Sequence, residues 1–179
     1  MPKPFGCYDG VLLMELVTDD EGNVAPRLND VSMSAEQAIE DHTQVMHYVQ
    51  LMLCAGIVHG DLSEFNVLVD DYGPVIIDLP QAVNAAANNN AFSMLQRDVR
   101  NMTDYYSEFA PELQETHYAE EMWALFEAGK LTPETELSGY FEFDDSEADV
   151  DTVLEEIKAA FEEEQERLER ISNADSEPE

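Results

Sequence analysis

The sequence between Gly56 and Gln81, GIVHGDLSEFNVLVDDYGPVIIDLPQ, constrains the fold of this chain more than any other stretch. Two runs of β-branched and aliphatic residues, Val67–Val69 and Val75–Ile77, lie on either side of the turn-forming sequence Asp70–Pro74. Two such runs around a short polar segment predict a β-hairpin with a five-residue loop. A hairpin brings the residues at its two outer ends close together.

Three polar side chains, Asp61, Asn66 and Asp78, stand at those outer ends and in the loop that enters the hairpin. A nucleotide such as ATP is bound through Mg²⁺, and this hard cation prefers carboxylate and amide oxygens, of which Asp78 and Asn66 supply one each. Asp61 is placed to orient a nucleophilic hydroxyl and accept its proton. The pattern predicts phosphoryl transfer; the structural alternative is a loop that caps its own turns.

The pattern H-x-D-x-x-x-x-N, followed by two strands and I-D, is the catalytic-loop and metal-loop arrangement of the protein-kinase superfamily. His59–Asn66, HGDLSEFN, and Ile76–Gln81, IIDLPQ, resemble the RIO family of atypical serine/threonine kinases. Ordinary protein kinases carry Arg after the His and Asp-Phe-Gly at the metal loop, where this chain has Gly60 and Asp78-Leu79-Pro80. Aminoglycoside and choline phosphotransferases share His-Gly-Asp but typically continue differently, so Ser63–Phe65 favours the RIO family.

The resemblance implies an α+β fold: a protein-kinase-like C-terminal lobe, mainly helical, with a small β-hairpin that carries the metal site. Within it Asp61 would be the catalytic aspartate, and Asn66 and Asp78 would hold Mg²⁺. The cofactors would be ATP and Mg²⁺, and the substrate an unidentified protein.

The apolar run Val11–Val17 is expected to form a buried strand. In the resemblance this run corresponds to the strand and hinge between the two kinase lobes. Met14 would then be the gatekeeper beside the adenine, and Glu15 and Val17 would offer a backbone carbonyl and amide to the base. The alternative is a strand with a tolerated Glu at its edge.

Three helices are expected in the lobe. Ser34 and Gln37 form a capping-box sequence at the start of the first helix, which ends at Gly56. The second runs over about Ala91–Phe109, and the third over about Tyr118–Ala128.

Asp98 in the second helix is open to two interpretations. In kinase-like folds an Asp near the start of the corresponding helix accepts hydrogen bonds from catalytic-loop amides, and Arg97-Asp98 resembles the RIO pattern at this place. The alternative is an exposed Arg-Asp pair of small energetic value. His42 and His47 are expected to be packing or solvated residues rather than metal ligands.

The chain has 179 residues and a formal net charge of −32, from 40 acidic and 8 basic side chains. This charge argues against direct nucleic-acid binding, which needs clustered Lys and Arg. Cys7 and Cys54 are expected to be reduced and packed. No long apolar run or leader-like N-terminus is present, so the expectation is a cytoplasmic protein without a membrane partner.

The expected domains are 1–17, an inter-lobe strand and hinge; 18–145, the kinase-like lobe; and 146–179, an acidic helix with a frayed tail. Residues 141–179 hold 16 acidic and three basic side chains, and a helix is expected over Asp149–Arg170. Its charge suits either a solvated face or recruitment of a basic partner such as a ribosomal particle.

The N-terminal lobe of a kinase supplies a Gly-rich loop and a strand Lys. These 179 residues contain no Gly-x-Gly-x-x-Gly motif, and only Lys3 precedes the hinge-like run. We therefore expect either a truncated RIO-type kinase or a catalytically inactive C-lobe that acts as an interaction module. A small-molecule phosphotransferase of the aminoglycoside or choline kinase type is a second alternative.

Overall fold

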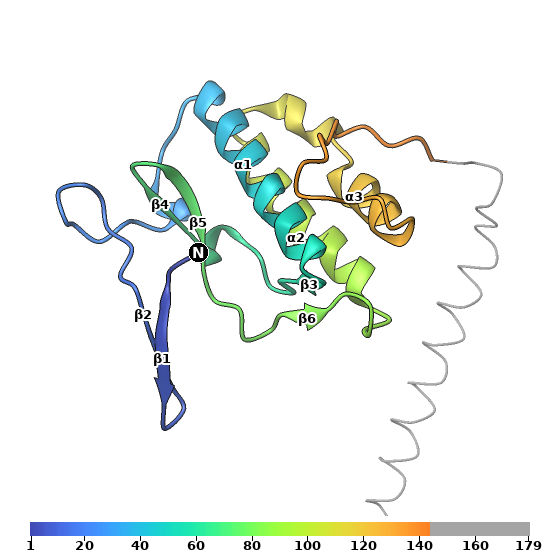
Figure 1. Ribbon diagram of the computed structural model, residues 1–179. Coiled ribbons are helices and arrows are strands. Elements are labelled where there is room, and N and C mark those ends of the chain that lie inside the picture. Colours follow the sequence, from blue (N-terminus) through green and yellow to red (C-terminus); the bar gives the residue numbers. More distant parts are fainter. Residues whose placement is uncertain (144–179) are drawn as a thin grey trace, which may run out of the picture. The chain divides into compact units, whose positions relative to one another are not determined.

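The computed structural model describes residues 1–143, of which 1–141 form one unit (Figure 1). Within the described residues the fold is mixed α/β, as expected, with three α-helices and three two-stranded antiparallel sheets. The helix expected over Asp149–Arg170 lies outside them. The elements in chain order are β1 Pro4–Tyr8, β2 Val11–Met14, the 3-10 turn η1 Leu28–Asp30, α1 Ala35–Cys54, β3 Ile57–Val58, η2 Glu64–Asn66, β4 Val67–Asp70, β5 Gly73–Ile76, β6 Val83–Asn84, α2 Ala91–Ser107, η3 Pro111–Glu115 and α3 Tyr118–Glu127.

Helix α1 begins and ends where the sequence predicted. The Ser34 hydroxyl accepts a hydrogen bond from the Gln37 backbone amide at 3.2 Å. The Gln37 side chain does not complete the capping box, because its amide donates instead to Asp41 Oδ1 at 2.8 Å. Gly56 follows the last turn with φ +76°, the left-handed conformation that favours glycine after a helix.

The core lies among α1, α2 and α3, which pack against one another. Many of their periodic apolar positions are buried, as the spacing predicted, including Met46, Leu53, Leu95, Met102, Tyr106 and Met122. Helix α2 ends at Ser107, two residues before the predicted Phe109. The amides of Glu108 and Phe109 bond to carbonyls three residues back, so the last turn tightens out of the α-helical pattern.

The β4–β5 hairpin has a shorter turn than the sequence suggested. Its strands pair as predicted, but the register continues to Asp70 opposite Gly73, which leaves a two-residue turn in place of the five-residue loop. Asp70 Oδ1 accepts the Tyr72 amide at 2.8 Å, and Gly73 takes φ +116°. This side-chain bond and the positive φ close the chain tightly.

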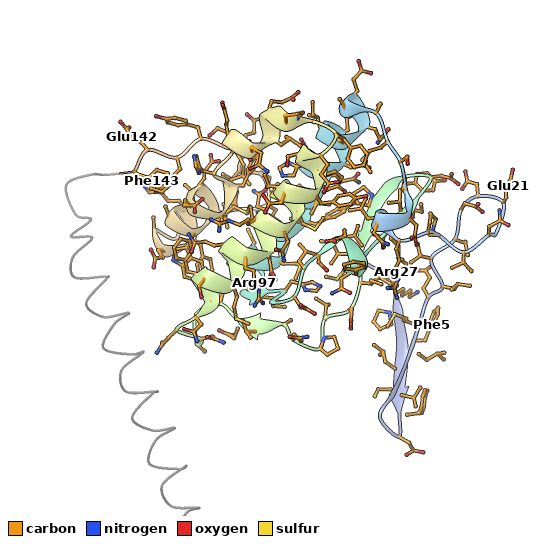
Figure 2. The ribbon with its side chains drawn as sticks, turned by 180° about the vertical axis from the view of Figure 1, so that it is seen from behind. Phe5, Glu21, Arg27, Arg97, Glu142 and Phe143 are labelled. Atoms are coloured by element: carbon orange, nitrogen blue, oxygen red, sulfur yellow. The ribbon has the colours of Figure 1, made fainter. Side chains whose placement is uncertain are left out.

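The prediction of a strand in the run Val11–Val17 is confirmed over Val11–Met14, but the prediction that this strand is buried is wrong. The strand β2 covers Val11–Met14 and pairs with β1, and its four side chains are 42–68% exposed. The sheet has two strands, so no further strand covers it among the described residues. Figure 2 shows Phe5 on this hairpin, where its side chain is 57% exposed.

His42 is fully buried on α1, with Nε2 3.0 Å from Thr103 Oγ1 and its ring against those of Tyr106 and Tyr118. Burial lowers the pKa of this imidazole from 6.5 to about 4. Unfolding therefore takes up a proton below pH 6.5, so the free energy of unfolding due to this group is present above pH 6.5 and is lost as the pH falls toward 4.

The unaltered chain should lose about 2 kcal/mol of unfolding free energy from His42 between pH 7 and pH 5, because a shifted pKa contributes about 1.4 kcal/mol per pH unit. We expect this loss to be absent in His42→Gln. Urea unfolding at both pH values measures this. His47→Gln, a change at an exposed position on the same helix, serves as the control because the carboxylates titrate equally in both variants. Equal pH dependence in the two variants would contradict the assignment.

Candidate active site

The catalytic-loop sequence His59–Asn66 forms a tight turn around Asp61, whose side chain is exposed. Gly60 adopts φ +81°, and a Cβ atom there would lie 2.8 Å from the Gln81 carbonyl oxygen. A glycine therefore suits this position for two reasons: the left-handed backbone and the close approach of the chain after β5.

Helix α2 binds both backbone amides that flank Asp61. Asp98 Oδ2 accepts the Gly60 amide at 2.7 Å, and Asp98 Oδ1 accepts the Leu62 amide at 3.0 Å. Asp98 is 1% exposed. The interpretation of Asp98 as an acceptor for catalytic-loop amides is confirmed, and the alternative of an exposed pair with Arg97 is wrong.

The same helix also binds the two carbonyls. Arg97 Nη2 donates to the Gly60 carbonyl, and Asn101 Nδ2 donates to the Leu62 carbonyl at 2.9 Å. Figure 2 shows Arg97 on α2. All four backbone polar groups of Gly60 and Leu62 are thus bonded to one helix face, which fixes the backbone on either side of Asp61. The sequence analysis anticipated the contacts of Asp98 but not those of Arg97 and Asn101.

Burial raises the pKa of the Asp98 carboxyl above its usual range, because desolvation disfavours the charged form. The amide hydrogen bonds from Gly60 and Leu62 act in the opposite direction, as does the positive charge of Arg97. The carboxylate form of Asp98 thus depends on the loop that it binds.

His59 connects the catalytic loop to the metal loop. It is 2% exposed, its Nε2 lies 3.0 Å from the Ile77 carbonyl oxygen, and its Nδ1 lies 3.3 Å from the Asp61 backbone nitrogen. A neutral imidazole with its proton on Nε2 satisfies both contacts, donating to Ile77 and accepting from Asp61. The histidine therefore has a structural role beside Asp61.

Asn66 and Asp78 lie at the open end of the β4–β5 hairpin. The Asn66 carbonyl accepts the Ile77 amide at 3.0 Å, which makes Asp78 the next residue beyond this pair. The Asn66 side-chain amide donates to the Asp61 carbonyl at 2.8 Å and so points its Oδ1 elsewhere. Asp78 is exposed and has φ +67°, an uncommon backbone conformation for a residue other than glycine.

The donor chemistry of these two residues fits Mg²⁺. Within residues 1–143 neither Asn66 Oδ1 nor the Asp78 carboxylate accepts a hydrogen bond that would occupy it. The described part of the chain holds no group of three or more His, Cys, Asp or Glu side chains arranged for a metal ion. Mg²⁺ is commonly held by one or two protein oxygens together with substrate phosphates and water, so a two-residue site is compatible with it.

The residues predicted to meet the adenine lie at and after the end of β2. Met14 ends β2 and is 42% exposed. The Glu15 amide donates to the Lys3 carbonyl at 2.8 Å, and the Val17 carbonyl accepts the Ala25 amide at 3.0 Å. No hydrogen bond among residues 1–143 occupies the Glu15 carbonyl or the Val17 amide, the two groups predicted to bind the base.

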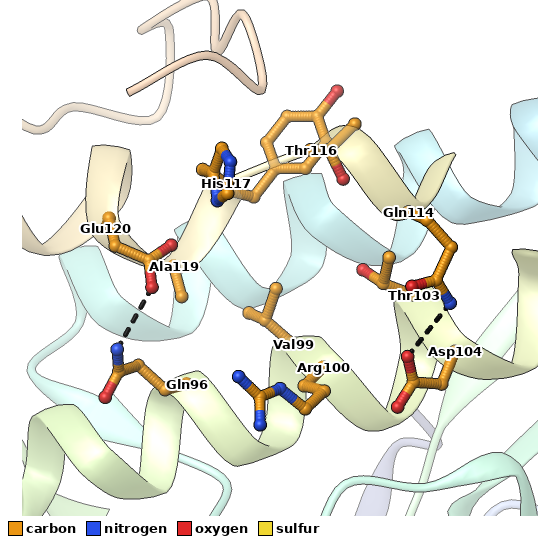
Figure 3. A pocket seen from close by; sticks show the side chains of 11 residues that line it. Gln96, Val99, Arg100, Thr103, Asp104, Gln114, Thr116, His117, Ala119 and Glu120 are labelled. Atoms are coloured by element: carbon orange, nitrogen blue, oxygen red, sulfur yellow. Dashed lines mark hydrogen bonds between the residues drawn. The ribbon is translucent and has the colours of Figure 1, made fainter. Parts of the chain in front are cut away.

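A polar pocket of about 300 Å³ lies between α2, η3 and α3 (Figure 3). Gln96 donates to Glu120 at 3.0 Å and Gln114 donates to Asp104 at 3.1 Å along its walls. None of the residues that line it belongs to the catalytic loop or the metal loop. The pocket is therefore separate from the candidate active site.

No helix in residues 1–143 is long and apolar enough to cross a membrane.

Comparison with known proteins gives one consistent result. The profile of the RIO domain matches residues 1–119. Over 108 residues the chain is 40% identical to the RIO-type serine/threonine-protein kinase Rio1 of Haloferax volcanii. It is 36% identical over 106 residues to the serine/threonine-protein kinase RIO1 of Homo sapiens, and 34% identical over 111 residues to the RIO-type kinase Rio1 of Thermoplasma acidophilum.

These matches cover 59%, 59% and 62% of this chain, and 35%, 18% and 56% of the respective relatives. The chain thus spans about half or less of the length of the relatives that it matches. The part matched by the RIO domain, residues 1–119, contains the catalytic loop, the metal loop and α2.

Proposed function

Because this chain belongs to the RIO domain family, we propose that it forms the hinge and C-terminal lobe of an ATP- and Mg²⁺-dependent serine/threonine protein kinase. In the proposed reaction a protein hydroxyl oxygen bonds to the γ-phosphorus of ATP, the bond from that phosphorus to the bridging oxygen breaks, and ADP leaves. The hydroxyl proton passes to Asp61, which also orients the hydroxyl.

The other predicted site residues bind rather than react. Asn66 and Asp78 would hold Mg²⁺, which neutralises phosphate charge once ATP is bound. Met14 would border the adenine, with the Glu15 carbonyl and the Val17 amide as its hydrogen-bond partners. The cytoplasm is the proposed location, and the proposed acceptor is a protein of unidentified sequence.

The observation that supports the proposal most is the attachment of the catalytic loop to α2. An exposed carboxylate is useful in phosphoryl transfer only when its position is fixed, because such catalysis consists mainly of positioning and charge stabilisation. Here Gly60 and Leu62 are each held by two hydrogen bonds from α2, while the carboxylate of Asp61 between them stays exposed.

Transfer of radiolabelled phosphate from ATP to protein tests the proposal. We compare residues 1–179 with the same chain extended upstream by a RIO-type N-terminal lobe that carries the Gly-rich loop and strand Lys. We expect the extended protein to label serine or threonine, and residues 1–179 alone to be at least 100-fold slower, since losing one charge-stabilising donor already costs about 10²–10³ in rate.

Each of the other outcomes identifies a different function. Labelling of aminoglycosides or choline, but of no protein, would indicate a small-molecule phosphotransferase. An extended protein that transfers no phosphate to any acceptor would indicate an interaction module.

The metal role of Asp78 is tested separately by calorimetry on residues 1–179. We expect little heat with Mg²⁺ alone, because Mg²⁺ dehydrates reluctantly without phosphate ligands, and a measurable heat with Mg²⁺ and ATP together. Asp78→Ala should weaken the second binding by about 10-fold or more. Asp71→Ala, at the exposed turn of the same hairpin, should bind like the unaltered chain. Equal heats for Asp78→Ala and Asp71→Ala would remove Asp78 from the ligand set.

A further inference from the structure

Gln81 bonds to the proposed catalytic side chain. Its side-chain Nε2 donates to Asp61 Oδ2 at 3.1 Å, across 20 residues of sequence. Among residues 1–143 the Asp61 carboxylate accepts no other hydrogen bond, and this one occupies only one of its two oxygens. Gln81 lies in the loop that follows Asp78, so it joins the metal loop to the catalytic loop through side chains.

The backbone around Gln81 sets the direction in which its side chain leaves the chain. Residues 79–82 form a β-turn closed by the Ala82 amide and the Leu79 carbonyl at 3.0 Å. Pro80 occupies the second position of this turn, where its fixed φ is favourable, and Gln81 takes the third. The turn therefore presents residue 81 without the conformational freedom of an open loop.

A second contact holds the same residue against the catalytic loop. The Gln81 carbonyl oxygen approaches Gly60 so closely that a Cβ atom on Gly60 would lie 2.8 Å away. The backbone of residue 81 thus packs on the residue before Asp61, while its side chain bonds to Asp61 itself. Because Gln81 contacts two neighbouring residues of the catalytic loop, its bond to Asp61 is more than an isolated surface contact.

The bond has a definite chemical consequence. An exposed Asp side chain rotates among several rotamers and about its terminal torsion, so its oxygens are not directed at one place. A neutral amide donor on one oxygen sets the carboxylate plane and stabilises its charge, yet it cannot compete for the proton near neutral pH. The other oxygen stays available to an acceptor hydroxyl.

We propose that Gln81 is a positioning residue for phosphoryl transfer: it holds Asp61 Oδ2 and so directs Asp61 Oδ1 at the acceptor hydroxyl. This inference rests on the proposed kinase function.

Two variants of the N-lobe-extended protein separate this role from simple packing. Gln81→Leu removes the donor and keeps the size of the side chain, and Gln81→Glu keeps its shape but sets a carboxylate against Asp61. We expect kcat for phosphate transfer to fall about 10-fold in Gln81→Leu, the effect of losing a hydrogen bond to a charged group, and further in Gln81→Glu. The affinity for Mg²⁺ and ATP should change less than threefold in both.

The two roles differ in which of the two variants should have the lower kcat. A packing role predicts that Gln81→Glu, the closer match in shape, is the milder change, whereas positioning by a donor predicts the reverse. Gln114→Leu is the control, because it removes another Gln–Asp hydrogen bond, from Gln114 to Asp104, together with a bond from Gln114 to Ser107, both away from the site. This control should keep full activity.

A second measurement uses residues 1–179 and needs no turnover. In NMR spectra we expect Asp61→Asn to shift the side-chain amide signal of Gln81, and Asp104→Asn to leave it in place. The inference is overturned if Gln81→Leu transfers phosphate at the unaltered rate while Asp61→Ala is slowed. It is also overturned if the side-chain amide signal of Gln81 does not shift in Asp61→Asn. Retained transfer in Asp61→Ala would instead overturn the proposed function itself.

Discussion

In the N-lobe-extended protein, Asp61→Ala is expected to lower the rate of phosphate transfer to protein by about 10²–10⁴-fold, the range that positioned proton acceptors contribute. Nucleotide affinity should change less than threefold, because Asp61 addresses the acceptor hydroxyl whereas Asn66 and Asp78 address the metal. The measurement is labelled phosphate transfer, run beside an ATP titration in Mg²⁺.

The control for this experiment lies in the same loop. Glu64 carries a carboxylate three residues after Asp61 and belongs to η2. Glu64→Ala removes the same charge from the same region, so it should lower the rate by less than threefold. Unchanged transfer in Asp61→Ala would refute the catalytic assignment. Equal losses of rate in Asp61→Ala and Glu64→Ala would show that the loss reflects removal of negative charge from the loop, not a specific role of Asp61.

Local sequence signals predicted the framework of the site well. Ser34 before an apolar periodic run, and Gly56 after it, are sufficient to define α1 because caps act on groups within one turn. The runs Val67–Val69 and Val75–Ile77 around a turn-forming sequence likewise predicted the hairpin, because its pairing is short-range. The turn between the strands was wrong, since strand pairing extends over Asp70 and Gly73, two residues with low strand propensity.

The contacts that position Asp61 were harder to predict because they span long stretches of sequence. Arg97 and Asn101 reach the catalytic loop across more than 35 residues, and Gln81 reaches it across 20. A polar residue on a helix or in a turn gives no sign of its distant partner. Only Asp98 could be anticipated, through the resemblance to the RIO family.

The attachment of the catalytic loop to α2 depends on Asp98 more than on any other single side chain. Asp98→Ala leaves the amides of Gly60 and Leu62 buried without an acceptor, at about 1–3 kcal/mol for each. We expect the free energy of unfolding of residues 1–179, measured in urea, to fall by about 2–6 kcal/mol. That is a large part of the stability of an ordinary domain.

Two further variants make this result interpretable. Asp98→Asn keeps the shape but supplies one acceptor oxygen instead of two, and its NH₂ group faces an amide donor, so it should lose about half as much stability and still fold. Asp104→Ala removes an exposed carboxylate on the same helix and should cost less than about 1 kcal/mol. In the N-lobe-extended protein Asp98→Asn should also slow phosphate transfer, because the backbone on both sides of Asp61 loses part of its anchorage to α2. Equal stability in Asp98→Ala and Asp104→Ala would show that α2 does not hold the catalytic loop through Asp98.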